Sequence, residues 1–262
     1  MDHKKGLTLA QLAKLAYSTD IFMVTAEARK IDSKFSCYLT KVGAFNHFYK
    51  FVTNDSINII FPGTRSPTSK EGIDDALLDA ACVMVPCDVW FPTIKFAFKT
   101  AKYRMHFGFL HRADTVYPQV LSSILSEENY DKKAVYVCGH SLGGAVAGIV
   151  GWALAESLRP NTVVTFGSPK IGNEAFSRTL TNRMDVIRYI NSGDIITQLP
   201  VRSMTGLLFS SYGQRVDIGD PNTWPSMSIE AMAKADIVSG IRHSIDLYIA
   251  NIQTLINGGT YV

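Results

Sequence analysis

The sequence lacks the basic runs typical of nucleic-acid-binding proteins and the long apolar stretches typical of membrane-spanning proteins. Its 26 Lys and Arg residues nearly balance its 23 Asp and Glu residues, which leaves a formal charge of +3 and no basic run on which nucleic acid would dock. The longest uninterrupted apolar stretch, Leu142 to Ala155, is well short of the roughly 20 residues that a membrane-spanning helix needs. We therefore expect no nucleic-acid partner and no transmembrane segment.

Cysteine is also scarce, because the chain has only four: Cys37, Cys82, Cys87 and Cys138. No two of them form a C-x-x-C pair, the spacing typical of zinc and redox sites. Cys138 lies in an apolar run and is expected to be a small buried hydrophobe. We assign none of the four a function.

The N-terminal region lacks the continuous apolar core of a secretory signal, because Gln11 and Lys14 interrupt it. The spacing of Thr8 and Gln11 instead predicts a capped helix from Thr8 to Tyr17. We expect either a cytoplasmic protein or a secreted one whose signal was removed before this numbering begins.

What is present is an ample supply of core residues, since 47% of the chain is hydrophobic and 11% is aromatic. No low-complexity linker or repeat divides the chain, so one domain over residues 1–262 is expected. Short apolar runs that predict strands cover Phe48 to Thr53, Ile57 to Phe61, Cys82 to Val85, Ala134 to Val137, Val163 to Phe166 and Val186 to Ile190. Helical patterns cover Ser69 to Ala81, Asp114 to Ser126, Leu142 to Leu158, Asn173 to Leu180 and Ser244 to Ile256. This alternation predicts an α/β fold with a mostly parallel central sheet flanked by helices.

The clearest chemical motif is the G-x-S-x-G pattern from Gly139 to Gly143, which is centred on Ser141. It follows an apolar strand and opens an Ala-rich helical stretch, which is the strand-turn-helix setting of a nucleophile elbow. The alternative is that Ser141 merely caps a helix at a glycine-rich turn. A phosphate-binding loop is not indicated, because neither G-x-G-x-x-G nor a G-K-[ST] ending is present.

A serine nucleophile needs a histidine to take its proton and a carboxylate to hold that histidine. In chains with this elbow the order is serine, acid, histidine, and His243 is the only histidine after Ser141. Asp194 is the best-placed acid, because it lies in a turn directly after the strand from Val186 to Ile190. Asp217 and Asp220 are the fallback candidates.

Several patches together resemble the class 3 lipases, a family of fungal triacylglycerol lipases with bacterial and plant relatives. The matching patches span nearly the whole chain and are Phe61 to Thr64, His106 to Phe109, Gly139 to Gly144, Phe166 to Asn173, Asn191 to Pro200 and His243 to Tyr248. The resemblance implies an α/β-hydrolase fold with Ser141 as nucleophile, Asp194 as orienting acid and His243 as base. It also implies an oxyanion hole formed by Thr64 and Leu142.

Two further histidines lie in these patches. His106 is framed by aromatic residues, and we expect it to be a packed structural group rather than an acid or base. His140 precedes the nucleophile and is expected to support the site by packing.

The chain departs from the family in its lid region, because Ser69 to Ala81 lacks the tryptophan that relatives often carry there. Two segments are candidate lids. One is Ser66 to Leu78, and the other is Val89 to Phe98, where aromatic residues accompany lysines. A lid would make activity rise sharply when the substrate aggregates.

These features predict a serine carboxylester hydrolase that cleaves acylglycerols through an acyl-Ser141 intermediate, at a lipid-water interface and without a metal or organic cofactor. One alternative is a phospholipase A1 or general lipid acylhydrolase. Another is a lipid-binding module that keeps the fold without catalysis.

Overall fold

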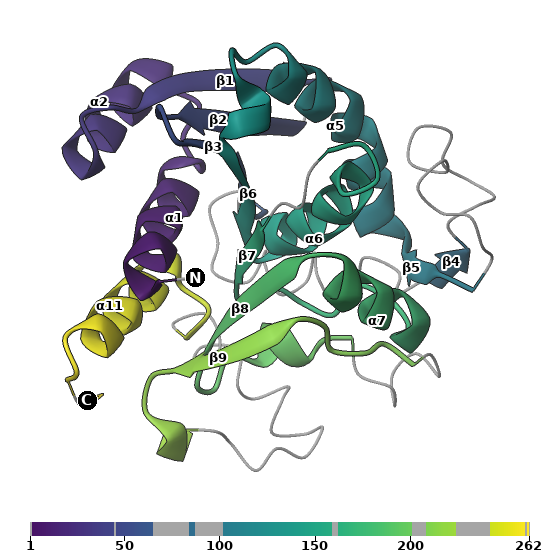
Figure 1. The fold of residues 1–262 in the computed structure, drawn as a ribbon. Helices are drawn as coiled ribbons and strands as arrows, with labels where there is room; N and C mark the ends of the chain where they lie inside the picture. Colours follow the sequence, from purple (N-terminus) through teal and green to yellow (C-terminus); the bar gives the residue numbers. More distant parts are fainter. Residues whose placement is uncertain are drawn as a thin grey trace.

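The centre of the molecule is a seven-stranded sheet in the order β1-β2-β3-β6-β7-β8-β9 (Figure 1). The computed structural model describes residues 2–44, 46–64, 84–86, 102–158, 162–200, 208–223, 242–259 and 261. The first three strands pair antiparallel, and β3, β6, β7, β8 and β9 run parallel. The strands are β1 (Ser36–Val42), β2 (Asn46–Val52), β3 (Ser56–Phe61), β6 (Ala134–His140), β7 (Thr162–Phe166), β8 (Asp185–Asn191) and β9 (Gln214–Ile218).

Helices cover both faces of the sheet. On one side lie α1 (His3–Leu15), α2 (Ile21–Ile31) and α11 (Ile245–Ile256), and on the other α5 (Phe107–Leu125), α6 (Leu142–Leu154) and α7 (Glu174–Arg183). Three short 3-10 helices are η2 (Tyr130–Lys132), η3 (Ile195–Gln198) and η4 (Pro221–Thr223). None of the helices in the described part of the chain has both the length and the apolarity to cross a bilayer.

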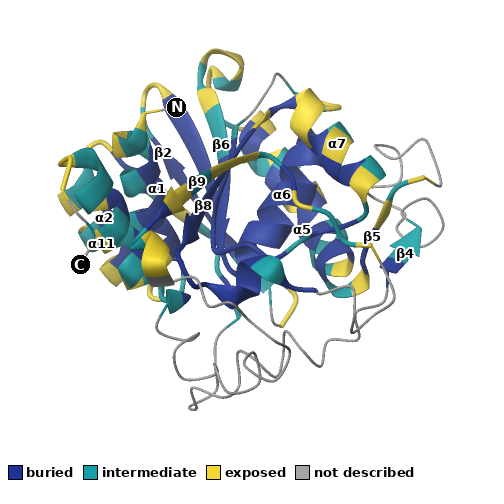
Figure 2. Ribbon diagram, turned by 90° about the horizontal axis from the view of Figure 1, so that it is seen from below, coloured by how far each residue is buried: buried dark blue, intermediate teal, exposed yellow. Residues whose placement is uncertain are grey.

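The sheet separates two hydrophobic cores, because successive side chains of a strand point to opposite faces. On β6, Val137 belongs to the core under α5 and α6, whereas its neighbour Cys138 belongs to the core under α1 and α11. Both side chains are fully buried, as expected for a strand covered on both faces. Figure 2 shows this buried slab of strands beneath helices whose outer surfaces are exposed. The predicted α/β architecture is confirmed, and so is the burial of Cys138.

The N-terminal helix begins earlier than the sequence pattern predicted. It starts at His3 rather than Thr8, because the Asp2 side chain accepts a hydrogen bond from the backbone N–H of Lys4 and caps the helix there. The Thr8 hydroxyl lies inside the helix and donates to the carbonyl of Lys4. The predicted cap at Thr8 is therefore wrong, although Leu9 and the other apolar residues of this face are buried as expected.

The remaining differences concern short elements. The strand predicted at Cys82 to Val85 is described as β4 (Met84–Pro86), which pairs with β5 (Arg104–His106) in a separate antiparallel sheet. The helix predicted at Ser69 to Ala81, both candidate lids (Ser66 to Leu78 and Val89 to Phe98) and the cysteines Cys82 and Cys87 lie outside the described residues.

Candidate active site

The G-x-S-x-G motif forms a tight turn between β6 and α6. Ser141 has φ 57° and ψ −129°, a backbone conformation that is uncommon for a residue with a side chain. Glycine is required on either side of it, because a Cβ at Gly139 would overlap the backbone of Gly143, and a Cβ at Gly143 would overlap the carbonyl oxygen of Phe61. The strand, the helix and the end of β3 are thus pressed together around the serine.

The predicted acid and base form a buried pair. The Nδ1 atom of His243 lies 2.8 Å from Oδ2 of Asp194, and both side chains are almost completely buried. Because an ionised carboxylate only accepts hydrogen bonds, Nδ1 is the donor and a neutral His243 carries its lone pair on Nε2. Asp194 lies just after the C-terminal end of β8, and His243 lies just before the N-cap of α11. The end of a strand and the start of a helix thus position the two side chains.

Two buried polar atoms at this site have no hydrogen-bond partner among the described residues: the Oγ atom of Ser141 and the Nε2 atom of His243. His140, the neighbour of Ser141 in the chain, contacts His243 directly: its Nε2 atom donates to the carbonyl oxygen of His243 at 2.7 Å, and the rings of His140 and His243 are 4.7 Å apart. Buried polar groups are rarely left unsatisfied without a functional reason. Hydrogen bonds between a nucleophile and its base are often long before substrate binds. The unpaired Ser141 and His243 atoms are therefore consistent with a nucleophile and its base in the absence of substrate.

The carboxylate of Asp194 has two further partners that the sequence did not reveal. Its Oδ1 atom accepts from the backbone N–H of Ile196, and its Oδ2 atom accepts from the hydroxyl of Tyr248 at 2.6 Å. Burial and the adjacent carboxylate raise the pKa of Tyr248 well above its ordinary value, so this hydroxyl remains a donor. In the sequence Tyr248 is visible only as one apolar-face position of α11.

Gly167 lies against this pair from the end of β7. It has φ 61°, and a Cβ there would stand 2.8 Å from Oδ2 of Asp194 and 2.9 Å from the ring of His243. Only glycine allows the Asp–His pair to pack this closely on the backbone. The sequence marked this residue as part of a family patch but did not give its role.

A second hydrogen-bonded chain holds the elbow from the N-terminal side. Tyr17, two residues beyond α1, places its hydroxyl 2.7 Å from Nδ1 of His140. Because Nε2 of His140 donates to the carbonyl of His243, Nδ1 of a neutral ring is the acceptor and Tyr17 donates. Burial and the neighbouring His243 lower the pKa of His140 well below its ordinary value, which keeps the ring neutral. The expectation that His140 supports the site by packing is thereby confirmed.

The turn from Pro62 to Thr64 follows β3 and meets the elbow directly. A Cβ at Gly63 would lie 3.1 Å from Cβ of Ser141 and would overlap the hydroxyl of Tyr17. Thr64 is half-buried at the end of this turn. Leu142 is the first residue of α6, where a backbone N–H has no acceptor within its own helix. Of the two residues that the resemblance implied for the oxyanion hole, Leu142 therefore directly follows Ser141, and Thr64 directly follows the glycine that lies against Ser141.

The remaining candidates lie elsewhere. His106 is buried at the N-terminus of α5, with its ring stacked on Phe109 at 4.0 Å, as expected for a structural residue. The fallback acid Asp217 is exposed and pairs with Arg215, and Asp220 accepts from the backbone N–H of Asn222. Neither fallback acid contacts His243 in the structure, which leaves Asp194 as its partner.

The sequence is similar to those of known lipases and phospholipases. The lipase (class 3) family model matches residues 67–204. A lipase from Caenorhabditis elegans, ZK262.3, is 30% identical over 205 residues, which cover 73% of this chain and 54% of that protein. The chloroplastic phospholipase A(1) DAD1 of Arabidopsis thaliana is 28% identical over 95 residues, which cover 35% of this chain and 21% of that protein. The chain thus spans about half the length of the worm lipase and a smaller part of the plant protein.

Solved structures establish the fold. A fungal lipase in complex with an inhibitor superimposes with a TM-score of 0.68 and 20% sequence identity, over 92% of this chain and 95% of that one. The shared architecture is the α/β-hydrolase fold, with a mostly parallel sheet between two layers of helices. Together, the family match and the sheet topology show that the chain belongs to the class 3 lipase family.

Proposed function

We propose that this protein hydrolyses lipid esters, acylglycerols first among them, through a covalent acyl-Ser141 intermediate. The observation that supports this most is the convergence of three residues from distant parts of the chain: a strained Ser141, and His243 held by Asp194 with its Nε2 unpaired. Membership of the class 3 lipase family and the similarity to a worm lipase support the same substrate class.

In the first half of the reaction, Oγ of Ser141 attacks the ester carbonyl carbon while Nε2 of His243 takes the hydroxyl proton. The negative charge of Asp194 stabilises the resulting imidazolium through the 2.8 Å hydrogen bond to Nδ1. Backbone N–H groups of Leu142 and Thr64 stabilise the oxyanion of the tetrahedral intermediate. Collapse of that intermediate breaks the bond to the alcohol, which leaves with the proton from His243.

In the second half, a water molecule attacks the acyl-enzyme. His243 takes a proton from this water and returns it to Oγ of Ser141 as the fatty acid leaves. Each step uses the same pair of atoms, Oγ of Ser141 and Nε2 of His243, and both are buried without a hydrogen-bond partner among the described residues.

The direct test is Ser141→Ala, assayed on an emulsified diacylglycerol. Loss of the nucleophile is expected to lower the rate by about 10⁶-fold, as for nucleophile removal in subtilisin. Circular dichroism and thermal unfolding establish that the variant is folded. A purified Ser141→Ala protein with the parental rate contradicts the proposal.

A second candidate is phospholipid acyl hydrolysis. It draws on the similarity to a plant phospholipase A(1) and on a pocket with cationic lining residues beside the turn from Pro62 to Thr64. The same catalytic residues serve both substrates, so the distinction depends on what binds the alcohol side of the ester.

A further inference from the structure

A cavity of about 400 Å³ lies beside the turn from Pro62 to Thr64, whose residues line it. Its walls come from the end of β1 and the start of β2, from α5 and α6, and from the turn itself. The residues that line it are Thr19, Lys41, Gly43, Ala44, Asn46, His47, Phe61, Pro62, Gly63, Thr64, Arg112, Val116 and Val146. Gly63 and Thr64 thus belong both to this pocket and to the surroundings of Ser141.

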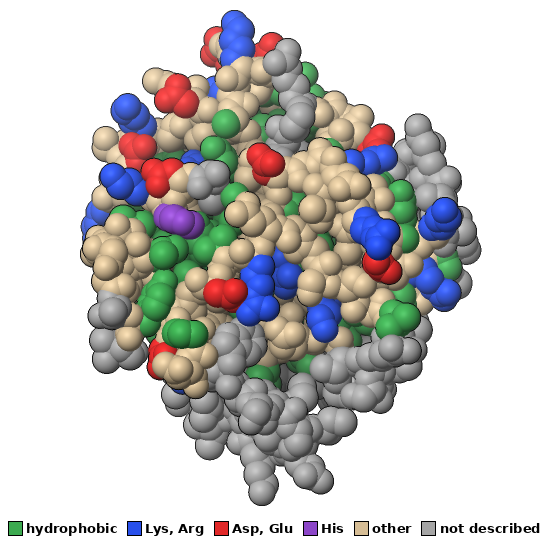
Figure 3. Space-filling model, turned by 60° about the horizontal axis from the view of Figure 1, so that its bottom comes forward, with side chains coloured by type: hydrophobic (Ala, Val, Ile, Leu, Met, Phe, Trp, Pro, Cys, Tyr) green, Lys and Arg blue, Asp and Glu red, His purple; other side chains and the backbone are tan. Residues whose placement is uncertain are grey.

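The charged side chains that line this pocket in the described part of the chain are cationic. Arg112 of α5 and Lys41 at the end of β1 line it together with His47, and none of the described lining residues is Asp or Glu. On the face of the molecule seen in Figure 3, by contrast, cationic and anionic side chains are interspersed. A pocket that holds cations without acids attracts anions.

Arg112 is the more buried of the two cations in this pocket and has no counter-charge among the described residues. It is only partly exposed, and none of the described residues forms an ion pair or hydrogen bond with its guanidinium. Burial lowers the pKa of Arg112, with no carboxylate to offset it, yet a guanidinium remains protonated at neutral pH. Partly burying a cation without a counter-ion costs free energy of desolvation, and the binding of an anionic ligand would offset this cost.

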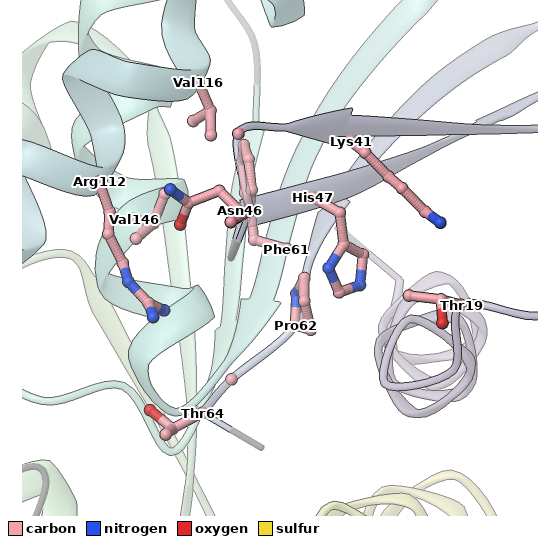
Figure 4. Close-up of a pocket in the computed structure, with 13 residues that line it drawn as sticks. Thr19, Lys41, Asn46, His47, Phe61, Pro62, Thr64, Arg112, Val116 and Val146 are labelled. Atoms are coloured by element: carbon pink, nitrogen blue, oxygen red, sulfur yellow. The ribbon is translucent and has the colours of Figure 1, made fainter.

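The direction of the side chain connects the pocket to the reaction. Figure 4 shows Arg112 extending from α5 toward the segment that carries Thr64, with Val146 of α6 beside it. An anion at the guanidinium therefore lies beside the turn that would hold the oxyanion. The planar, five-donor guanidinium matches the oxygens of a phosphate group better than any other side chain.

We propose that this pocket is a phosphate subsite that binds the phosphodiester of a glycerophospholipid whose ester carbonyl lies at Ser141. The inference rests on the proposed function and names its substrate class more narrowly. Glycerol joins the ester and the phosphate by a few bonds, and Gly63 both lines the pocket and lies against Ser141, so one molecule is able to place its ester carbonyl at Ser141 and its phosphate in this pocket. Arg112 acts on binding and takes no part in proton transfer.

The test compares two substrates with identical acyl chains, dioctanoyl phosphatidylglycerol and dioctanoylglycerol, in micelles of a neutral detergent. For Arg112→Gln, the ratio of kcat/KM on the phospholipid to kcat/KM on the diacylglycerol is expected to fall by about 10- to 100-fold, the value of a charge-assisted hydrogen bond. Arg112→Lys is expected to restore part of the ratio because it keeps the charge. Arg178→Gln, an exposed arginine paired with Glu174 on α7, is the matched control and leaves the ratio unchanged.

A binding measurement separates this inference from the proposed function. Calorimetric titration of the Ser141→Ala protein with dihexanoyl phosphatidylglycerol monomers is expected to show binding that Arg112→Gln weakens by the same factor. Inorganic phosphate is the second ligand: if it binds through Arg112 and the phospholipid does not, the pocket holds free phosphate and the inference is wrong.

The outcomes in the activity assay are also distinct. If the parental protein cleaves diacylglycerol but Arg112→Gln lowers both substrates equally, the phosphate subsite is refuted while ester hydrolysis stands. If neither lipid is cleaved and Ser141→Ala changes nothing, the proposed function fails, and the calorimetric result alone decides whether the phosphate subsite exists.

Discussion

Asp194 is the residue on which the site's geometry depends. Its two carboxylate oxygens accept hydrogen bonds from three donors: the backbone N–H of Ile196, the ring of His243 and the hydroxyl of Tyr248. The first of these is an ordinary turn interaction that any Asx turn makes. The other two meet on Oδ2, so the oxygen that holds His243 is itself fixed by a buried tyrosine.

Tyr248→Phe removes one donor from this oxygen and keeps the ring, which packs edge-on against Phe166. We expect kcat to fall about tenfold with little change in KM, because about 1.4 kcal/mol of orientation and charge stabilisation is lost from a hydrogen bond to a charged group. Steady-state kinetics on a soluble short-chain ester measure both constants. A rise in KM at constant kcat would instead place Tyr248 in substrate binding.

At this scale the sequence revealed the residues with distinctive chemistry and missed those that support them. The motif and the chain order predict Ser141 and His243 as site residues, and its place after a strand predicts Asp194. Tyr17 lies in no motif and Tyr248 only ends a family patch, and helical periodicity assigns a tyrosine to a face without saying which carboxylate or imidazole its hydroxyl reaches. Hydrogen bonds between residues 123 or 54 positions apart depend on the folded chain.

At the level of elements, the elbow is a junction of β3, β6 and α6 with no room for added atoms. Gly143→Ala is expected to lower the free energy of unfolding by about 2 to 3 kcal/mol, because the new methyl group overlaps carbonyl oxygens of β3 and the turn after it. Activity is expected to fall as well, since the displaced turn carries Thr64. Urea denaturation and ester hydrolysis check the two effects.

Gly108→Ala is the matched control, because it also lies in the first turn of a helix but a Cβ there meets only the His106 ring at 3.4 Å. This variant is expected to be as stable as the parent or slightly more so. Equal free energies of unfolding for Gly143→Ala and Gly108→Ala would contradict the prediction, because they would show that the elbow accommodates a methyl group at residue 143.

Strands β1 and β9 and helix α2 were not predicted, because their sequences lack a clear hydrophobic pattern for the element that they form. β1 and β9 are the edge strands of the sheet and are largely exposed or half-buried, so they lack the continuous apolar run of a buried strand. The first turn of α2 combines Ile21, Phe22 and Val24, residues that favour strands when read alone. Its cap at Asp20 and its packing in the folded chain select the helix. The central parallel strands β3, β6, β7 and β8 and the fully buried helix α6 match the predicted segments well.

At the level of the whole molecule, a neutral histidine buried between two layers makes stability depend on pH. His140 has a pKa well below the ordinary value of 6.5 in the folded state, whereas the unfolded chain takes up a proton near that value. The unfolded state therefore binds more protons below pH 6.5. The contribution of His140 to the free energy of unfolding falls there by up to about 1.4 kcal/mol per pH unit.

Comparison with His140→Gln isolates this contribution from those of other groups. Between about pH 7.5 and about pH 5.5, the parent is expected to lose more unfolding free energy than the variant, by roughly 1 kcal/mol. Urea unfolding at both pH values measures the difference. Parallel pH dependences of the two proteins would mean that His140 is protonated in the fold, in conflict with the hydrogen bond that its Nδ1 atom accepts from Tyr17.

The most direct measurement of the catalytic proposal is covalent labelling by a serine-directed alkyl phosphonate, followed by mass spectrometry of the intact protein and its peptides. One phosphonyl group is expected on Ser141, none on Ser141→Ala, and labelling of His243→Ala slower by orders of magnitude because the proton acceptor is gone. A parent protein that stays unlabelled, as a lipid-binding module would, or one labelled equally fast without His243, contradicts it.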